Sequence, residues 1–92
     1  MKLIEIIRNL DTIDTGQTIY AAEPWTPSSE AIPVREPEAG NLPAEAQRLG
    51  LRYFLEVSVA RDFLDGWVSN LGAHSTDEQK CARLIQYAVN DA

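Results

Sequence analysis

LRYFLEVSV, residues Leu51–Val59, is the segment on which the fold depends, because apolar and polar side chains nearly alternate along it. Alternation of this kind is typical of a β-strand with one face against a core. The wholly apolar face, which we expect to meet the core, carries Tyr53, Leu55, Val57 and Val59. The opposite face carries Phe54, Glu56 and Ser58. This second, mixed face is predicted to be partly solvated or to meet a partner.

Two further strands are predicted before this segment. Thr18–Ala22 and Ala31–Arg35 are rich in β-branched, aromatic and small apolar residues, and turn-forming residues flank them. Pro33 has no N–H to donate to a sheet, so the second of these is expected to be an edge strand or to carry a bulge. Residues 44–50 follow a proline and end in glycine, which predicts a helical turn closed by Gly50.

Helices are predicted at both ends of the chain from the spacing of apolar residues. Near the start, the stripe consists of Leu3, Ile6, Ile7 and Leu10. A second helix is expected over residues 60–71, with Trp67 in the core and Gly72 as the stop. The last helix is expected to begin with a capping box of Ser75 and Glu78. Its predicted buried stripe is Cys81, Leu84, Ile85, Ala88 and Val89.

The resulting order is α-β-β-β-α-α, with the helical turn before the third strand. The simplest two-layer arrangement is an α+β fold, a small three-stranded, mainly antiparallel sheet with helices packed on one face. The 92 residues share one composition, so a single globular domain over residues 1–92 is expected. The uncovered edge strand near Pro33 and the apolar Phe54 also predict self-association as a homodimer.

The charge balance limits the classes of partner. With 14 Asp and Glu against 8 Lys and Arg, the formal net charge is −6. Nucleic acids and anionic membranes attract clustered cations, so neither is expected as a partner, whereas a basic protein is. The single cysteine fits a reducing compartment, and no signal peptide or membrane-spanning run is visible. A cytoplasmic location is therefore expected.

No catalytic, cofactor or metal motif stands out. The five glycines are isolated, so none forms a phosphate-binding loop. His74 and Cys81 are the chain's only histidine and cysteine, too few for a zinc site. We interpret Cys81 as a small buried hydrophobe and His74 as an exposed loop residue. The sequence therefore predicts no catalytic residues, no cofactor, no metal and no enzymatic activity.

Four residues are candidates for an interaction surface. Trp25 lies in a loop between two prolines, where it either caps the core or anchors a partner. Asp62 and Asp65 are neighbours on the polar side of the predicted helix. Glu56 is expected near them at the end of the strand. These carboxylates form either a solvated acidic face or a docking patch for a basic partner.

Several segments together resemble a family of small bacterial proteins of unknown function. The segments are Gln17–Ala21, Pro24–Ala31, Tyr53–Val57, Ala60–Leu64 and Cys81–Ala88. The resemblance covers nearly the whole chain. It implies a stand-alone bacterial domain and carries over no activity and no catalytic residue.

Three functional hypotheses follow. The leading one is a protein-interaction module, of the immunity or antitoxin type, that neutralises a basic partner. The second is a small-ligand-binding or regulatory domain, with its ligand between the Trp25 loop and residues 36–50. The third is an enzyme that uses an acidic residue, Ser28 or Ser29, which would need a perturbed carboxylate in a concave site.

Overall fold

The computed structural model describes residues 1–71 and 75–91. Its elements in chain order are helix α1 (Leu3–Arg8), 3₁₀-helix η1 (Leu10–Thr12), strands β1 (Thr18–Ala21) and β2 (Ala31–Val34), helix α2 (Ala44–Leu49), strand β3 (Arg52–Glu56), and helices α3 (Val57–Leu71) and α4 (Asp77–Asp91). The strands form a three-stranded antiparallel sheet in the order β2-β1-β3. The predicted α+β class, the sheet and the order of the main elements are confirmed.

Strand β1 occupies the centre of the sheet, and all four of its residues are buried. Its neighbour β2 is an edge strand, as Pro33 predicted, with Pro33 opposite Ile19. The N-terminal residues lie along this region, because the Ala31 N–H donates to the Met1 carbonyl at 2.7 Å. At the opposite edge lies β3, which pairs only with β1 among the described residues. Homodimer formation through an exposed edge stays a prediction.

The alternation predicted along Leu51–Val59 is wrong in two respects. First, the strand ends at Glu56 and α3 begins at Val57, so the last three residues are helical. Second, the register with β1 shifts between Ile19 and Tyr20, where β3 accommodates one extra residue. Such a bulge reverses which side chains point to a given face.

The bulge exchanges the predicted environments of two aromatic residues. Phe54 is 2% exposed and Leu55 is 8% exposed, and both belong to the main core. Tyr53 is instead 45% exposed and lies edge-to-face with Tyr20, at 6.2 Å between ring centroids. The predicted core face, which was expected to begin with Tyr53 and Leu55, is therefore not continuously buried.

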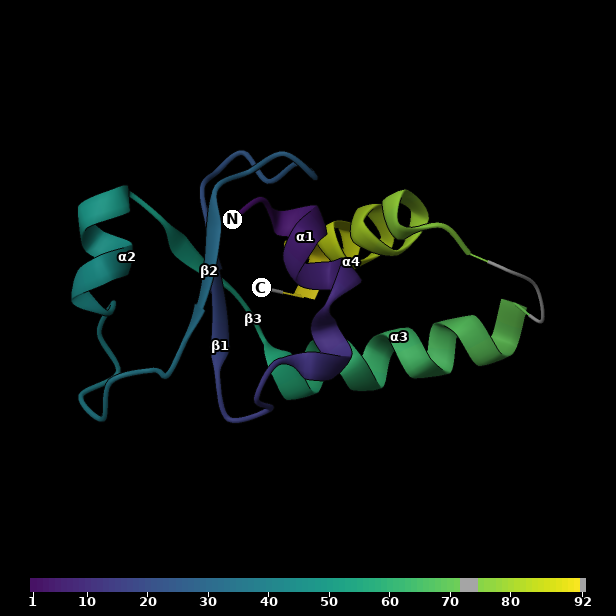
Figure 1. The fold of residues 1–92 in the computed structure, drawn as a ribbon, viewed down its shortest axis with the longest axis horizontal. Helices are drawn as coiled ribbons and strands as arrows, with labels where there is room; N and C mark the ends of the chain where they lie inside the picture. The colour runs from purple at the N-terminus through teal and green to yellow at the C-terminus, as the bar shows by residue number, and fades with distance from the viewer. Residues whose placement is uncertain (72–74, 92) are drawn as a thin grey trace.

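The main core lies between the sheet and helices α1, α3 and α4, which the view in Figure 1 places together on one side of the sheet. The predicted N-terminal stripe is confirmed, since its members are at most 4% exposed; these are Leu3, Ile6, Ile7 and Leu10. Helix α4 contributes Cys81, Leu84 and Ala88 to the same cluster. Trp67 is partly buried against it. The three predicted helices therefore share one face of the sheet.

Helix α2 is the helical turn expected at residues 44–50, and it lies across the sheet from the other helices (Figure 1). Ala46 packs there with Tyr20 and Leu51 in a second, smaller apolar cluster. Gly50 ends the helix with a φ of 71°, a left-handed conformation that glycine adopts without strain. The predicted glycine stop is confirmed, and α2 adds a partial third layer to the expected two.

Helix α4 begins one residue later than its predicted capping box requires. The Gln79 N–H donates to Thr76 Oγ1 at 3.1 Å, and the Thr76 N–H donates to Gln79 Oε1 at 2.9 Å. The capping pair is therefore Thr76 and Gln79, not Ser75 and Glu78. The predicted inclusion of Val89 in the buried stripe of this helix is also wrong, because Val89 is 61% exposed. The predicted roles of Gly72 and His74 lie outside the described residues.

The cap predicts a measurable difference between two neighbouring hydroxyl side chains. We expect Thr76→Ala to lower the free energy of unfolding by about 1 kcal/mol, because the N–H of Gln79 loses its acceptor. Ser75→Ala is the matched control and should change stability by less than about 0.5 kcal/mol. Urea denaturation of both variants measures the difference. A larger loss for Ser75→Ala would assign the cap to Ser75.

Candidate functional site

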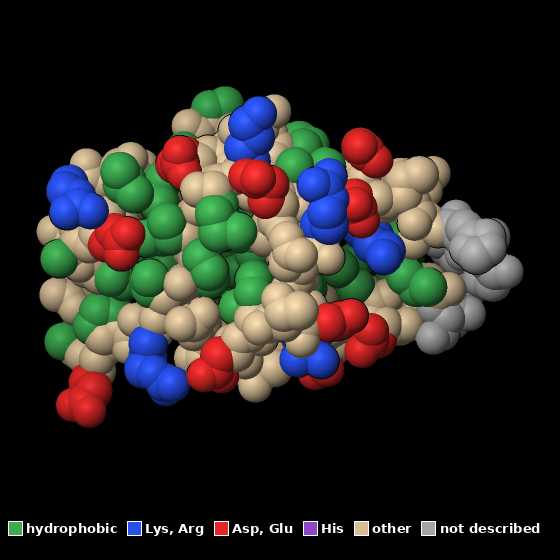
Figure 2. Space-filling view, in the orientation of Figure 1, with side chains coloured by type: hydrophobic (Ala, Val, Ile, Leu, Met, Phe, Trp, Pro, Cys, Tyr) green, Lys and Arg blue, Asp and Glu red, His purple; other side chains and the backbone are tan. Residues whose placement is uncertain are grey.

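A pocket with a volume of about 330 Å³ opens between α1, η1, α3 and α4. We call it the interhelical pocket. Its lining residues are Ile7, Arg8, Leu10, Asp11, Arg61, Leu64, Asp65, Val68 and Lys80. These residues come from both ends of the chain, so the pocket exists only when the helices have packed. In Figure 2, basic and acidic side chains lie close together on the half of the molecule that holds α1, α3 and α4.

The aliphatic part of the lining belongs to the edge of the main core. Ile7 and Leu10 extend the stripe of α1 into η1, and Leu64 lies on the core-facing side of α3; all three are buried. Val68, one turn beyond Leu64, is half-buried. The pocket therefore has a fixed apolar floor, since most of its members are held by core packing.

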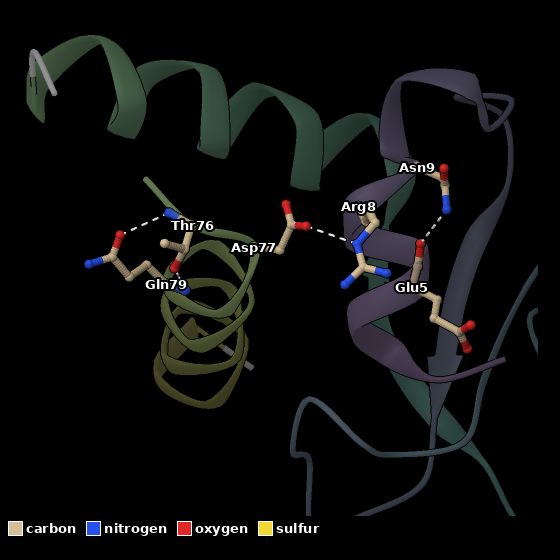
Figure 3. Close-up of polar contacts among 6 residues, drawn as sticks. All are labelled: Glu5, Arg8, Asn9, Thr76, Asp77 and Gln79. Carbon is tan, nitrogen blue, oxygen red and sulfur yellow. Dashed lines mark hydrogen bonds and ion pairs between the residues drawn. The ribbon is translucent and has the colours of Figure 1, made fainter. Parts of the chain in front are cut away.

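Two of the basic residues around the pocket are each matched by a carboxylate. Arg8 Nε donates to Asp77 Oδ2 at 2.8 Å, which links α1 to the first turn of α4 (Figure 3). The hydrogen bond and charge of Asp77 raise the pKa of the Arg8 guanidinium. Arg61 Nε lies 3.8 Å from Asp11 Oδ1, which links α3 to η1. These pairs lie at the surface, so each contributes little to stability.

The other two charged lining residues have no such match. Lys80 on α4 and Asp65 on α3 form no side-chain ion pair or hydrogen bond with any described residue. They have opposite charges and stand on different helices around one pocket. The pocket thus offers one cationic and one anionic group that are both available to a ligand.

The four residues predicted for an interaction surface do not converge. Asp65 lines the interhelical pocket, whereas Asp62 is exposed on α3 outside the lining. Glu56 is exposed at the end of β3. Partial burial raises the pKa of the Tyr53 hydroxyl, and the negative charge of Glu56 adds to this effect. Only Asp65 of the four therefore belongs to the pocket.

Trp25 caps one end of the main core. Its ring packs edge-to-face against Phe54 with 4.9 Å between centroids, and its indole N–H donates to the Ala21 carbonyl at 3.2 Å. Ser29 fastens the loop around it, since its hydroxyl accepts from the Thr26 N–H at 2.8 Å. The core-capping alternative predicted for Trp25 thus matches the structure.

The packing of Trp25 also contradicts the predicted position of the ligand site. The predicted site lay between the Trp25 loop and residues 36–50. Trp25 packs against the main core, whereas α2 packs on the second cluster across the sheet. These two segments therefore do not enclose a common site, and the interhelical pocket takes its place.

Most of the pocket could not be found from sequence patterns. On α3, Arg61 and Asp65 are four residues apart, a spacing that places them on one helix face. Arg8 and Lys80 lie on helices at opposite ends of the chain, so no spacing rule connects them. The packing of α1 against α4, visible in Figure 3, places Arg8 and Lys80 around the same pocket.

The cysteine matches its predicted structural role. Cys81 is fully buried in the main core, and this burial raises the pKa of its thiol to about 11. The thiol is therefore protonated near neutral pH, the form that is a poor nucleophile and metal ligand. Within residues 1–71 and 75–91, no group of three or more His, Cys, Asp and Glu side chains is placed to hold a metal ion.

Comparisons with protein-family models, with curated proteins and with solved structures found no match. In the described part of the chain, no helix is long and apolar enough to cross a membrane.

Proposed function

We propose that this protein is a non-enzymatic binding domain that holds a small amphipathic ligand in the interhelical pocket. The observation that supports this proposal is the combination of a buried aliphatic floor with a charged rim in one concavity. Sites for small molecules combine apolar lining with placed polar groups, and their volumes run from about 300 to 1,000 Å³. Five of the nine described lining residues are charged, so this pocket is more polar than most such sites. At about 330 Å³, this pocket suits a ligand at the small end of that range.

The chemistry of the rim favours binding over catalysis. Among the residues whose side chains the structure describes, the lining contains carboxylates, guanidinium groups and one amine, and no serine, cysteine or histidine. Asp65 is exposed and the Asp11 side chain is 91% exposed. Acid–base catalysis by a carboxyl group usually depends on a desolvated setting that these two side chains lack. Charged groups at the mouth of an apolar pocket instead serve to orient a ligand.

Such a ligand would act as a bridge between helices. It would contact α1, α3 and α4 together, and a ligand that binds only this arrangement stabilises the folded protein by mass action. The α3–α4 pair would then be held more firmly when the ligand is present. This supports a regulatory role, in which ligand concentration sets the stability of one helical arrangement.

The proposal is tested with a panel of small amphipathic anions, cations and zwitterions. At millimolar concentrations, at least one class should shift the methyl resonances of Ile7, Leu64 and Val68 and raise the melting temperature. Val68→Trp fills the pocket and should abolish these effects. Val89→Trp places the same bulk on an exposed site of α4 and should preserve them. If no class of compound shifts the floor methyls, the pocket is not a ligand site.

A second candidate function rests on the exposed carboxylates outside the pocket. Glu56 and Asp62 form no ion pair with any residue the structure describes, and the chain carries a net charge of −6. These features favour an interaction module of the immunity or antitoxin type that binds a basic protein in the bacterial cytoplasm. Affinity capture from the native host should then recover a stoichiometric basic partner. The double variant Glu56→Lys and Asp62→Lys should lose it, and equal recovery by both proteins would contradict this role.

A further inference from the structure

The geometry points to a zwitterion with an aliphatic side chain, an apolar α-amino acid, as the ligand of the interhelical pocket. This inference rests on the binding function proposed above and narrows it to one chemical class. It follows from three features of the described lining: the charges without an ion-pair partner, their placement on two different helices, and the aliphatic floor.

The first step is to identify the charges that a ligand can use. Asp77 already accepts from Arg8 at 2.8 Å, and Asp11 lies 3.8 Å from Arg61. Each of these arginines therefore has a carboxylate beside it. The two lining residues left without a charged partner in the described chain are Lys80 and Asp65. A simple anion can accept from Lys80 and from the guanidinium N–H groups of Arg8 and Arg61 outside these pairs, but it leaves Asp65 without a cation. A simple cation matches Asp65 and leaves Lys80 without an anion.

The second step concerns the placement of these two groups. Lys80 and Asp65 lie on α4 and α3, and their charged atoms are farther apart than the 4.0 Å that defines a direct ion pair. Both residues line the same pocket, so a ligand that occupies it can approach both groups. An α-amino acid carries its ammonium group and its carboxylate on the same carbon. Its ammonium group can donate to Asp65 while its carboxylate accepts from Lys80, in two charge-assisted hydrogen bonds.

The third step is the match to the floor. The third substituent of the α-carbon is the side chain, which points away from both charged groups. The apolar lining residues are Ile7, Leu10, Leu64 and Val68, all aliphatic. A flexible or branched aliphatic side chain can fill this floor, and its burial adds affinity in proportion to the apolar area removed from water. The volume of about 330 Å³ suits a single amino acid rather than a longer peptide.

The test uses three probes that share one aliphatic chain. Norleucine carries both charges, hexanoate lacks the ammonium group, and pentylamine lacks the carboxylate. We expect norleucine to bind at least about tenfold more tightly than either single-charge probe, because each probe leaves one rim group without a partner. Dissociation constants are measured by titration of the floor methyl resonances, with the full chain at fixed ionic strength.

Two variants test whether Asp65 binds the ammonium group of the ligand and Lys80 binds its carboxylate. Asp65→Asn should reduce the preference for norleucine over hexanoate to less than about threefold, and Lys80→Met should do the same for norleucine over pentylamine. Asp62→Asn and Arg48→Met alter exposed charges outside the pocket and should leave both preferences unchanged. Melting temperatures within a few degrees of the parent protein would establish that each variant is folded.

The outcomes separate this inference from the proposed function. If hexanoate or pentylamine binds as tightly as norleucine, the pocket takes a simple ion and the zwitterion inference is overturned while the binding function stands. If none of the three probes nor any compound of the wider panel binds, both fail. If Asp65→Asn and Lys80→Met keep the preference for norleucine over the single-charge probes, the inference is also overturned. Other groups would then bind the ammonium group and the carboxylate of the ligand.

Discussion

Phe54→Ala is expected to lower the free energy of unfolding by about 3–5 kcal/mol, the usual loss for a buried phenylalanine. Phe54 is 2% exposed, belongs to the main core and supports the ring of Trp25 at 4.9 Å. Domains of this size are stable by about 5–15 kcal/mol, so this one change removes a large share of the total. Urea denaturation monitored by circular dichroism measures the loss.

Tyr53→Ala is the matched control, because the two aromatic residues are adjacent in sequence. Tyr53 is 45% exposed on the opposite face of the sheet, so its loss should cost less than about 2 kcal/mol. Simple alternation along β3 makes the reverse prediction, with Tyr53 in the core and Phe54 outside. A larger loss for Tyr53→Ala than for Phe54→Ala would therefore show that the bulge beside Tyr20 is absent.

Trp25→Ala is expected to lower the free energy of unfolding by about 2–4 kcal/mol. The variant loses the edge-to-face contact with Phe54, the packing against the main core, and the hydrogen bond to the Ala21 carbonyl at 3.2 Å. Trp25→Phe retains an aromatic ring without the indole N–H and should lose less. A change within about 0.5 kcal/mol for Trp25→Ala would contradict a core-capping role.

A double-mutant cycle isolates the contact between the two rings. The variants Trp25→Ala and Phe54→Ala should show a coupling energy of about 0.5–1.5 kcal/mol, because aromatic pairs contribute beyond the area they bury. Additive effects would show that the rings are energetically independent.

Local periodicity allowed most elements to be predicted. The stripe of Leu3, Ile6, Ile7 and Leu10 needed only the helical repeat. The missing N–H of Pro33 predicted either an edge position or a bulge for β2, and the edge position is observed. Gly50 was recognisable as the end of α2 because few other residues adopt a positive φ readily. These signals are encoded within a few residues, so they do not depend on the rest of the fold.

The errors occurred where two distant segments decide the outcome together. The bulge in β3 depends on its register with β1, which alternation within β3 cannot reveal. Thr76 and Ser75 are equally good caps by residue type. The choice between them depends on where α4 starts, and its buried residues Cys81 and Leu84 are fixed by packing against the sheet and other helices.

The same division applies to the candidate site. Residue patterns were enough to predict that LRYFLEVSV, residues Leu51–Val59, begins as a strand, that Asp65 is exposed, and that Cys81 is buried. The bulge at Phe54 and the start of α3 at Val57 became visible in the folded chain and not before. The tertiary structure alone also placed Asp65 and Lys80 around one aliphatic floor. The physical reason is that a pocket between helices arises from packing of segments far apart in the chain, and packing has no local periodicity.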